Sequence, residues 1–159
     1  MISWNSLKMS IAGAKLSHLV QKDKIWDHGS MVEQVRTIVI LLKKAFHRRD
    51  AEVVKKCLTE TAFIKMKNKI AQTHGIGADE LIIEDELEQI SIIGVTPGKN
   101  GRPDKFTASI KFKKRKHNGF FSTANENYNT VQHLQFVRQK EWWLLNEIKT
   151  SSSLLKSTL

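Results

Sequence analysis

The hydrophobic period of this chain changes once, near residue 79, and this change constrains the fold more than any other feature. From Val32 to Leu42, apolar residues recur every three or four positions, which is the spacing of an amphipathic helix. From Phe106 to Phe112 they occupy alternate positions, which is typical of a strand with one buried face. We therefore expect an α+β domain in which helices come first and a sheet follows.

The first long helix has a start signal in the sequence. Ser30 and Glu33 have the spacing of a capping box, in which each side chain satisfies a free backbone group of the first turn. This pair predicts a helix that begins near Met31 and ends before the sequence HRRD.

Two shorter helices are predicted to follow. Asp50 can cap one over residues 51–58, and Thr59 or Thr61 can cap the next. Cys57 is the only cysteine, so no intrachain disulfide can form and a reducing or redox-indifferent compartment is expected. Because Cys57 lies in an apolar helical pattern, we expect a buried structural thiol.

Four strand-like stretches separated by turn sequences make up the second half of the chain. They span residues 81–96, 105–116, 128–138 and 142–149. Long strands joined by hairpins form an antiparallel meander, and the preceding helices must cover one of its faces. The domain is expected to occupy residues 30–150, after a basic amphipathic segment at 1–29 and before a Ser-rich tail at 151–159.

The second predicted strand ends in the basic run KKRK, and the first begins with the acidic run EDELE. Pairing Thr96 with Asp104 across the intervening turn places Glu86 opposite Lys114, so the two runs lie side by side. Opposite charges facing each other across strands stabilise a hairpin, which gives the basic run a structural explanation. The stretch still contributes candidates for binding an anionic surface: Lys114, Arg115, Lys116, Phe120 and Phe121. For the two phenylalanines, burial and exposure are both open.

The N-terminal segment from Trp4 to Gln21 contains no acidic residue and carries Lys8 and Lys15. Trp4, Leu7, Ile11 and Ala14 repeat at helical spacing. This pattern predicts a basic amphipathic helix, suited either to a membrane surface or to packing on the domain. Trp4, Lys8 and Lys15 are therefore candidates for contact with a membrane.

The formal net charge of +10 predicts an anionic partner, which could be nucleic acid, lipid headgroups or an acidic protein. Much of the excess lies on the predicted helices, and Arg48 and Arg49 at the HRRD step are candidate anion-binding residues. The helical cations lack the interleaved aromatic residues that stack on single-stranded bases. This disfavours a single-strand binding protein.

The last hairpin predicts a second kind of site. If RQKE forms its turn, Val137 lies opposite Trp142 and His133 lies opposite Asn146. The pocket candidates His133, Gln135, Asn146 and Trp142 would then lie at one sheet face. Acid–base catalysis in such a pocket needs a carboxylate near the histidine, and this face carries none. We expect no catalytic residues, metal, cofactor or small-molecule substrate.

Short motifs at both ends of the predicted domain resemble the Tim-forty-four-like domain family. In that family a tryptophan precedes a long helix, an alanine–aromatic step and an Arg-Asp step end it, and a Leu-Thr step starts the third helix. The matching residues here are Trp26, Ala45-Phe46, Arg49-Asp50 and Leu58-Thr59. Trp143, Leu145 and Ile148 in the closing stretch LQFVRQKEWWLLNEI are similar to the family's final strand.

The resemblance implies a cone-shaped, nuclear-transport-factor-two-like fold in which a strongly curved four-stranded antiparallel sheet wraps around the helices. It also implies a non-catalytic adaptor that contacts an acidic membrane surface, a ribosome or a client protein in protein transport. The implied location is the mitochondrial matrix at the inner membrane, or the bacterial cytoplasm peripheral to the inner membrane.

Two other functions stay open. One is a ribosomal protein of the mitochondrial large subunit that contacts ribosomal RNA. The other is a small-ligand-binding or isomerase-type enzyme with the same cone fold. A protein partner is expected, and one form that it could take is a homodimer through the sheet.

Overall fold

The computed structural model describes residues 3–72, 86–113 and 130–150. In chain order the elements are α1 (Trp4–Leu19), η1 (Lys24–Trp26), α2 (His28–Arg48), η2 (Ala51–Cys57), α3 (Glu60–Gln72), β1 (Glu86–Thr96), β2 (Lys105–Lys113), β3 (Thr130–Gln139) and β4 (Trp142–Thr150). The α+β class, with helices before an antiparallel meander, is confirmed. The sheet has the order β1-β2-β3-β4 and is open, not closed.

The start of α2 differs from the prediction. Asp27 is the N-cap, and its Oδ2 accepts hydrogen bonds from the backbone N–H of Ser30 at 2.9 Å and from the Ser30 hydroxyl at 2.8 Å. The capping box at Ser30 and Glu33 was therefore the wrong start signal, and the helix begins about one turn earlier than it predicted. Because Asp27 also has an acceptor oxygen at capping distance, the helix gains an extra turn before Met31.

The next two caps agree with the prediction. Asp50 Oδ1 accepts from the backbone N–H of Glu52 at 3.0 Å, although the short helix that follows is a 3-10 helix. Thr59 Oγ1 accepts from the backbone N–H of Ala62 at 3.3 Å at the start of α3.

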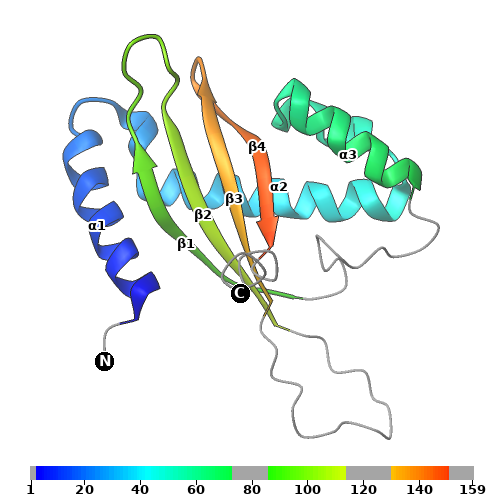
Figure 1. Cartoon of the computed structure of the whole chain (residues 1–159), viewed down its shortest axis with the longest axis horizontal. Coiled ribbons are helices and arrows are strands. Elements are labelled where there is room, and N and C mark those ends of the chain that lie inside the picture. Colours follow the sequence, from blue (N-terminus) through cyan, green and yellow to red (C-terminus); the bar gives the residue numbers. More distant parts are fainter. Residues whose placement is uncertain (1–2, 73–85, 114–129, 151–159) are drawn as a thin grey trace, which may run out of the picture.

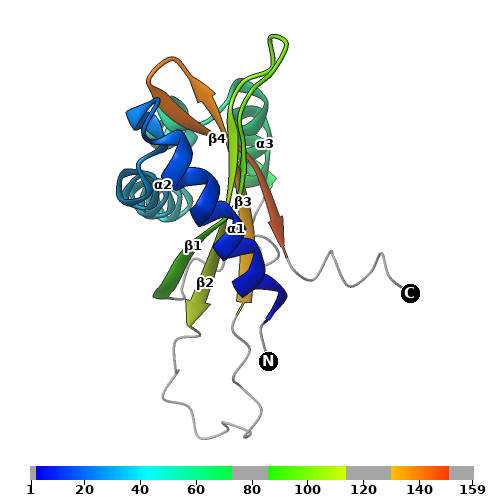
Figure 2. The same cartoon turned by 90° about the vertical axis from the view of Figure 1, so that its left-hand side faces the viewer.

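The core lies between α2 and one face of the sheet. Figure 1 shows α2 passing behind the strands, and Figure 2 shows it on one side of the sheet seen along its edge. The inward side chains alternate along the strands as expected, and they include Phe106, Ala108, Ile110, Phe112, Leu134 and Phe136. The other face of the sheet, which we call the open face, carries the intervening residues of these strands, which include Ser109 and His133 as well as Val131 and Val137.

An aromatic cluster joins the segment before α2 to the sheet. The rings of Phe106 and Phe136 stack with centroids 4.6 Å apart, and Trp143 meets Phe106 edge-on at 4.8 Å. Trp26 packs against Trp143 at 5.0 Å. The indole N–H of Trp143 also donates to the carbonyl oxygen of Ile25 at 3.2 Å, so this buried polar atom is satisfied.

Both edges of the sheet are partly covered. Helix α1 packs along β1. At the β4 edge, Gln34 Nε2 donates to the carbonyl oxygen of Trp143 at 2.8 Å, and the backbone N–H of Thr59 donates to that of Leu145 at 3.0 Å. These contacts occupy acceptors that could otherwise pair with another chain.

The register of the first hairpin matches the prediction only in its middle. Ile90 pairs with Ile110, but bulges near both ends shift the outer pairs by one residue, so that Thr96 pairs with Lys105 and Glu86 with Lys113. The acidic and basic strand ends are neighbours as expected as far as residue 113.

The register of the last hairpin was predicted incorrectly. Gln139 pairs with Trp142, so the turn contains only Lys140 and Glu141, and Lys140 has a φ of 57°. A further irregularity at Gln135 and Phe136 brings Lys149, and not Asn146, opposite His133. The sequence has no Gly or Asn at the turn to indicate the tight hairpin.

Candidate functional site

Helix α1 presents the most distinctive surface of the described structure. Trp4, Leu7 and Ile11, which we call the α1 stripe, are exposed by 69%, 42% and 50% respectively. The sequence pattern that indicated an amphipathic helix therefore lies on the solvent side. Apolar residues also occupy other faces of α1, including the exposed Met9 and the buried Leu16, so the helix as a whole is not amphipathic as predicted. Exposed large apolar residues that follow one another along one helix face are typical of a surface that contacts a membrane or a partner.

The helix is nevertheless docked on the domain. It uses a different face, on which Ala12 and Leu16 are buried in the core and Leu19 is partly buried. The prediction that α1 packs on the domain and the prediction that it offers a membrane-binding face are therefore compatible, because the two faces use different residues.

The charges on α1 all have the same sign. The helix contains Lys8 and Lys15 and no acidic residue. The ammonium of Lys8 lies 5.7 Å from the centroid of the Trp4 ring, within the range of a cation–π contact. Trp4, Lys8 and Lys15 are thus brought together on one helix, as predicted.

The other predicted anion-binding residues do not join this surface. Arg48 and Arg49 are at the C-terminal end of α2, which crosses behind the sheet to the side remote from α1 (Figure 1). Lys114, Arg115, Lys116, Phe120 and Phe121 lie outside the described residues. The nearest described part of their hairpin shows one opposite-charge contact, between Lys111 Nζ and Glu88 Oε2 at 3.8 Å.

Two of the four pocket candidates share a hydrogen bond in the described structure. Asn146 Nδ2 donates to Gln135 Oε1 at 3.3 Å, and Thr59 Oγ1 donates to Asn146 Oδ1 at 3.0 Å. Trp142 lies at the other end of β4, with its side chain exposed. His133 lies two residues from Gln135 on the open face, half-buried.

The pKa of His133 is lowered from its ordinary value, first by burial and then by the positive charges of Lys8 and Lys149. Both effects disfavour the protonated imidazole. The proximity of Lys8 to His133 could not be predicted from the sequence, because it depends on how α1 lies against the sheet. Lys149 was missed because the register of the last hairpin was wrong. For the same reason, the expectation that this face carries no carboxylate was wrong, since Glu147 pairs with Gln135.

Two grooves flank β4. One of about 220 Å³ lies between α3 and β4 and includes Asn146, and the other, of about 460 Å³, lies between α2, η2 and the start of β4 and includes Trp142. Neither is lined by His133 or Gln135. The predicted pocket residues are therefore distributed over separate surfaces.

Two further features bear on what the surface can do. No helix in the described ranges is long and apolar enough to cross a bilayer. Within the same ranges, no three side chains of His, Cys, Asp or Glu are grouped so that they could hold a metal ion.

A scan against protein-family models finds no match to this chain, and a search of the curated proteins finds none.

Proposed function

We propose that this protein is a non-catalytic adaptor domain that associates peripherally with an acidic membrane surface through α1. The observation that carries the proposal is the exposure of the α1 stripe on a helix that has lysines and no acid. Apolar side chains can enter the headgroup region while the lysines meet acidic lipids.

The charge of the chain favours lipid over an apolar protein partner as the occupant of this face. Lys8 and Lys15 lie on the same helix as the stripe, and the whole chain has a net charge of +10. Each lysine near an acidic membrane surface contributes about 1 kcal/mol to binding. A purely apolar protein interface would gain nothing from cations at this position.

We also propose the finer fold suggested by the resemblance, a curved cone of the nuclear-transport-factor-two-like type in a Tim-forty-four-like domain. The order of elements supports it, because three α-helices precede a four-stranded meander and α2 covers one face. The proposal includes a location at the mitochondrial inner membrane on the matrix side, or at the bacterial inner membrane on the cytoplasmic side.

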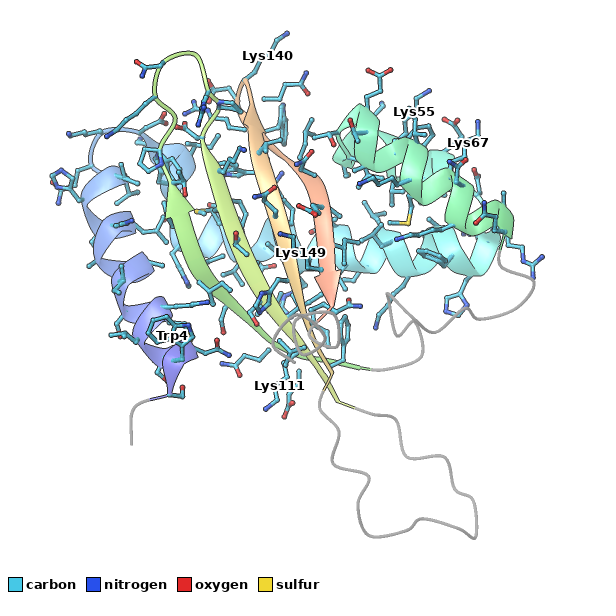
Figure 3. All side chains as sticks on the ribbon, in the orientation of Figure 1. Trp4, Lys55, Lys67, Lys111, Lys140 and Lys149 are labelled. Atoms are coloured by element: carbon cyan, nitrogen blue, oxygen red, sulfur yellow. The ribbon has the colours of Figure 1, made fainter. Side chains whose placement is uncertain are left out.

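Co-sedimentation with lipid vesicles tests the proposal. We expect binding to vesicles that contain phosphatidylglycerol, weak binding to phosphatidylcholine alone, and a decrease as salt is added. Changing Lys8 and Lys15 to glutamate removes both favourable charges, so affinity falls by at least about 30-fold, from roughly 1 kcal/mol for each lysine. Lys67→Glu with Lys140→Glu is the matched charge control, because these residues lie on α3 and in the β3–β4 turn (Figure 3).

The apolar contribution has its own matched control. Leu7→Ser with Ile11→Ser removes two exposed apolar side chains from α1, and we expect affinity to fall by about tenfold or more. Ile40→Ser with Ile64→Ser removes two that are exposed by 58% and 52% on α2 and α3, and it should leave binding unchanged. Equal binding to both kinds of vesicle, or equal loss in the two pairs of variants, would rule out the proposal.

The same samples test the two other functions. Salt-dependent binding to RNA in a filter assay, with no vesicle binding, would replace the membrane proposal by ribosomal RNA contact. An uncharged small molecule that raises the melting temperature of the wild type and not of His133→Ala would favour the pocket enzyme.

A further inference from the structure

A polar row crosses the middle of the open face. Ser91 of β1 pairs with Ser109 of β2, Ser109 pairs with His133 of β3, and His133 pairs with Lys149 of β4. Directly opposed residues in an antiparallel sheet point to the same face, with Cβ atoms about 5 Å apart. Four polar side chains from four strands are therefore adjacent on one surface.

Three of the four side chains in this row have no hydrogen-bond partner in the described part of the chain. Across residues 3–72, 86–113 and 130–150, the side chains of Ser91, Ser109 and His133 make no hydrogen bond. All three are partly buried. Partly buried donors that find no acceptor within the protein are available to an external one.

Charged side chains from α1 and β4 lie near His133. Lys8 of α1 and Lys149 of β4 are both near enough to lower the pKa of the imidazole. Lys149 Nζ lies 3.9 Å from Glu147 Oε2 on the same strand, and Lys111 in the next row is paired with Glu88. In contrast, the Lys8 ammonium contacts the Trp4 ring. In the described part of the chain, no carboxylate pairs with Lys8 and neutralises its charge. Trp4, Lys111 and Lys149 are labelled in Figure 3, which shows the open face.

We propose that Ser109, His133 and Lys149 form a binding site for a phosphate-type oxyanion on the open face of the sheet, and that the positive charge of Lys8 on α1 supports it. The hydroxyl, the imidazole N–H and the Lys149 ammonium are donors that a tetrahedral oxyanion accepts. A bound anion also offsets the repulsion between the two lysines and a protonated His133. Anion binding is therefore coupled to proton uptake by His133.

The anion has two sources that share this chemistry. One is the phosphate of a lipid headgroup, because Lys8 connects the site to Trp4 in the α1 stripe. The other is a soluble phosphate compound. The site itself does not depend on membrane association, so the two proposals can fail separately.

Proton NMR of the His133 imidazole in the full chain tests the site. The signal is identified by its loss in His133→Gln, and its pKa is measured in sodium sulfate and in sodium chloride at equal ionic strength. Sulfate is a tetrahedral dianion with constant charge over about pH 5 to 8, where histidine titrates. We expect the pKa of His133 to be higher in sulfate by about one unit.

The variants and the vesicle samples separate specific binding from general screening. We expect Lys8→Gln with Lys149→Gln to abolish the difference between sulfate and chloride, and Lys67→Gln, on α3, to preserve it. Leu7→Ser with Ile11→Ser should also preserve it while reducing vesicle binding. If vesicles of phosphatidic acid raise the pKa as sulfate does, the lipid phosphate is a ligand; if sulfate alone acts, the ligand is soluble.

Three results would overturn the site. The first is a His133 pKa that is the same in sulfate and in chloride. The second is a sulfate-induced rise in this pKa that is as large in Lys8→Gln with Lys149→Gln as in the wild type. The third is a pKa that rises with phosphatidic acid vesicles but not with sulfate. The last would reflect the general potential of the membrane surface and no localised site.

Discussion

Replacing Arg138 with methionine removes a side chain that connects three separate segments of the chain. Arg138 Nη1 donates to Asp23 Oδ2 at 2.6 Å, in the segment after α1, and to Asp104 Oδ2 at 3.1 Å, beside the β1–β2 turn. Its Nε donates to the carbonyl oxygen of Lys140 at 2.7 Å. The guanidinium thus fixes the segment that positions α1 relative to the sheet.

The expected loss follows from the exposure of these groups. The side chains of Arg138 and Asp104 are 22% and 21% exposed, so this charge-assisted hydrogen bond contributes about 1–1.5 kcal/mol. Asp23 is 40% exposed, so solvent screening reduces its contribution to about 0.5–1 kcal/mol. With roughly 0.5 kcal/mol for the Lys140 carbonyl, Arg138→Met should lower the free energy of unfolding by about 2–3 kcal/mol. For a chain of this size the melting temperature then falls by about 4–12 °C.

The pH dependence identifies the Asp23 contribution. The pKa of Asp23 lies below its ordinary value of 3.8, first because of the hydrogen bond from Arg138 and next because of the backbone N–H of Ile25. A lowered folded-state pKa gives stability that is present above pH 3.8 and is lost as the pH falls through the folded pKa. The difference between the wild type and Arg138→Met should therefore shrink below pH 3.8.

Urea unfolding followed by tryptophan fluorescence measures these quantities, with Arg138→Met, Asp23→Asn and the double variant. We expect a coupling energy of about 0.5–1 kcal/mol between the two sites. A loss below about 0.5 kcal/mol for Arg138→Met, which is typical of an unimportant surface change, would refute this interpretation of the network. So would a loss that stays constant into acid.

Three further predictions concern other parts of the chain. Gln132 is buried, and neither polar atom of its side chain has a hydrogen-bond partner in the described structure; Gln132→Met should raise the free energy of unfolding in urea by about 1 kcal/mol, and a decrease would show that the amide is bonded. Cys57 is partly buried and not fully buried as expected, and this partial burial raises the pKa of its thiol. The thiol should react with iodoacetamide more slowly in the native than in the unfolded protein at neutral pH; equal rates would contradict its partial burial. Because Asp27 and not Ser30 is the N-cap of α2, Asp27→Ala should lower the melting temperature more than Ser30→Ala, and the reverse order would favour the capping box.

Much of the fold could be predicted from the sequence because it depends on local periodicity. The α2 and β2 patterns identified both element types and the buried face, since Phe106, Ala108 and Ile110 are all buried. The cap at Asp50 was also predicted correctly, because its carboxylate accepts from the backbone N–H of Glu52, only two residues later in the sequence. Local signals of this kind need no knowledge of the neighbouring elements.

The register errors have a physical cause. Bulges insert a residue in one strand, and their positions depend on packing and twist more than on an obvious sequence signal. At the last turn, Lys140 adopts a positive φ without being glycine, so the two-residue turn was not indicated. The wrong turn and the missed irregularity at Gln135 and Phe136 together placed Asn146, in the prediction, where Lys149 pairs with His133.

The candidate site was predictable only in part for the same reason. The exposed stripe of Trp4, Leu7 and Ile11 follows from helical spacing. Which face of α1 packs on the domain does not, because both faces carry apolar residues, and Ala12 and Leu16 turn out to be the buried ones. The placement of Lys8 near His133 depends on that choice.

The environment of Trp4 in the presence of acidic vesicles tests the central claim most directly. In Trp142→Phe, Trp4 is the one exposed tryptophan of the chain, because Trp26 and Trp143 are buried. Insertion of the α1 stripe predicts that the Trp4 emission shifts to shorter wavelength with phosphatidylglycerol vesicles and becomes protected from an aqueous quencher. Emission that stays red and fully quenchable while the protein co-sediments with those vesicles would contradict membrane association through α1.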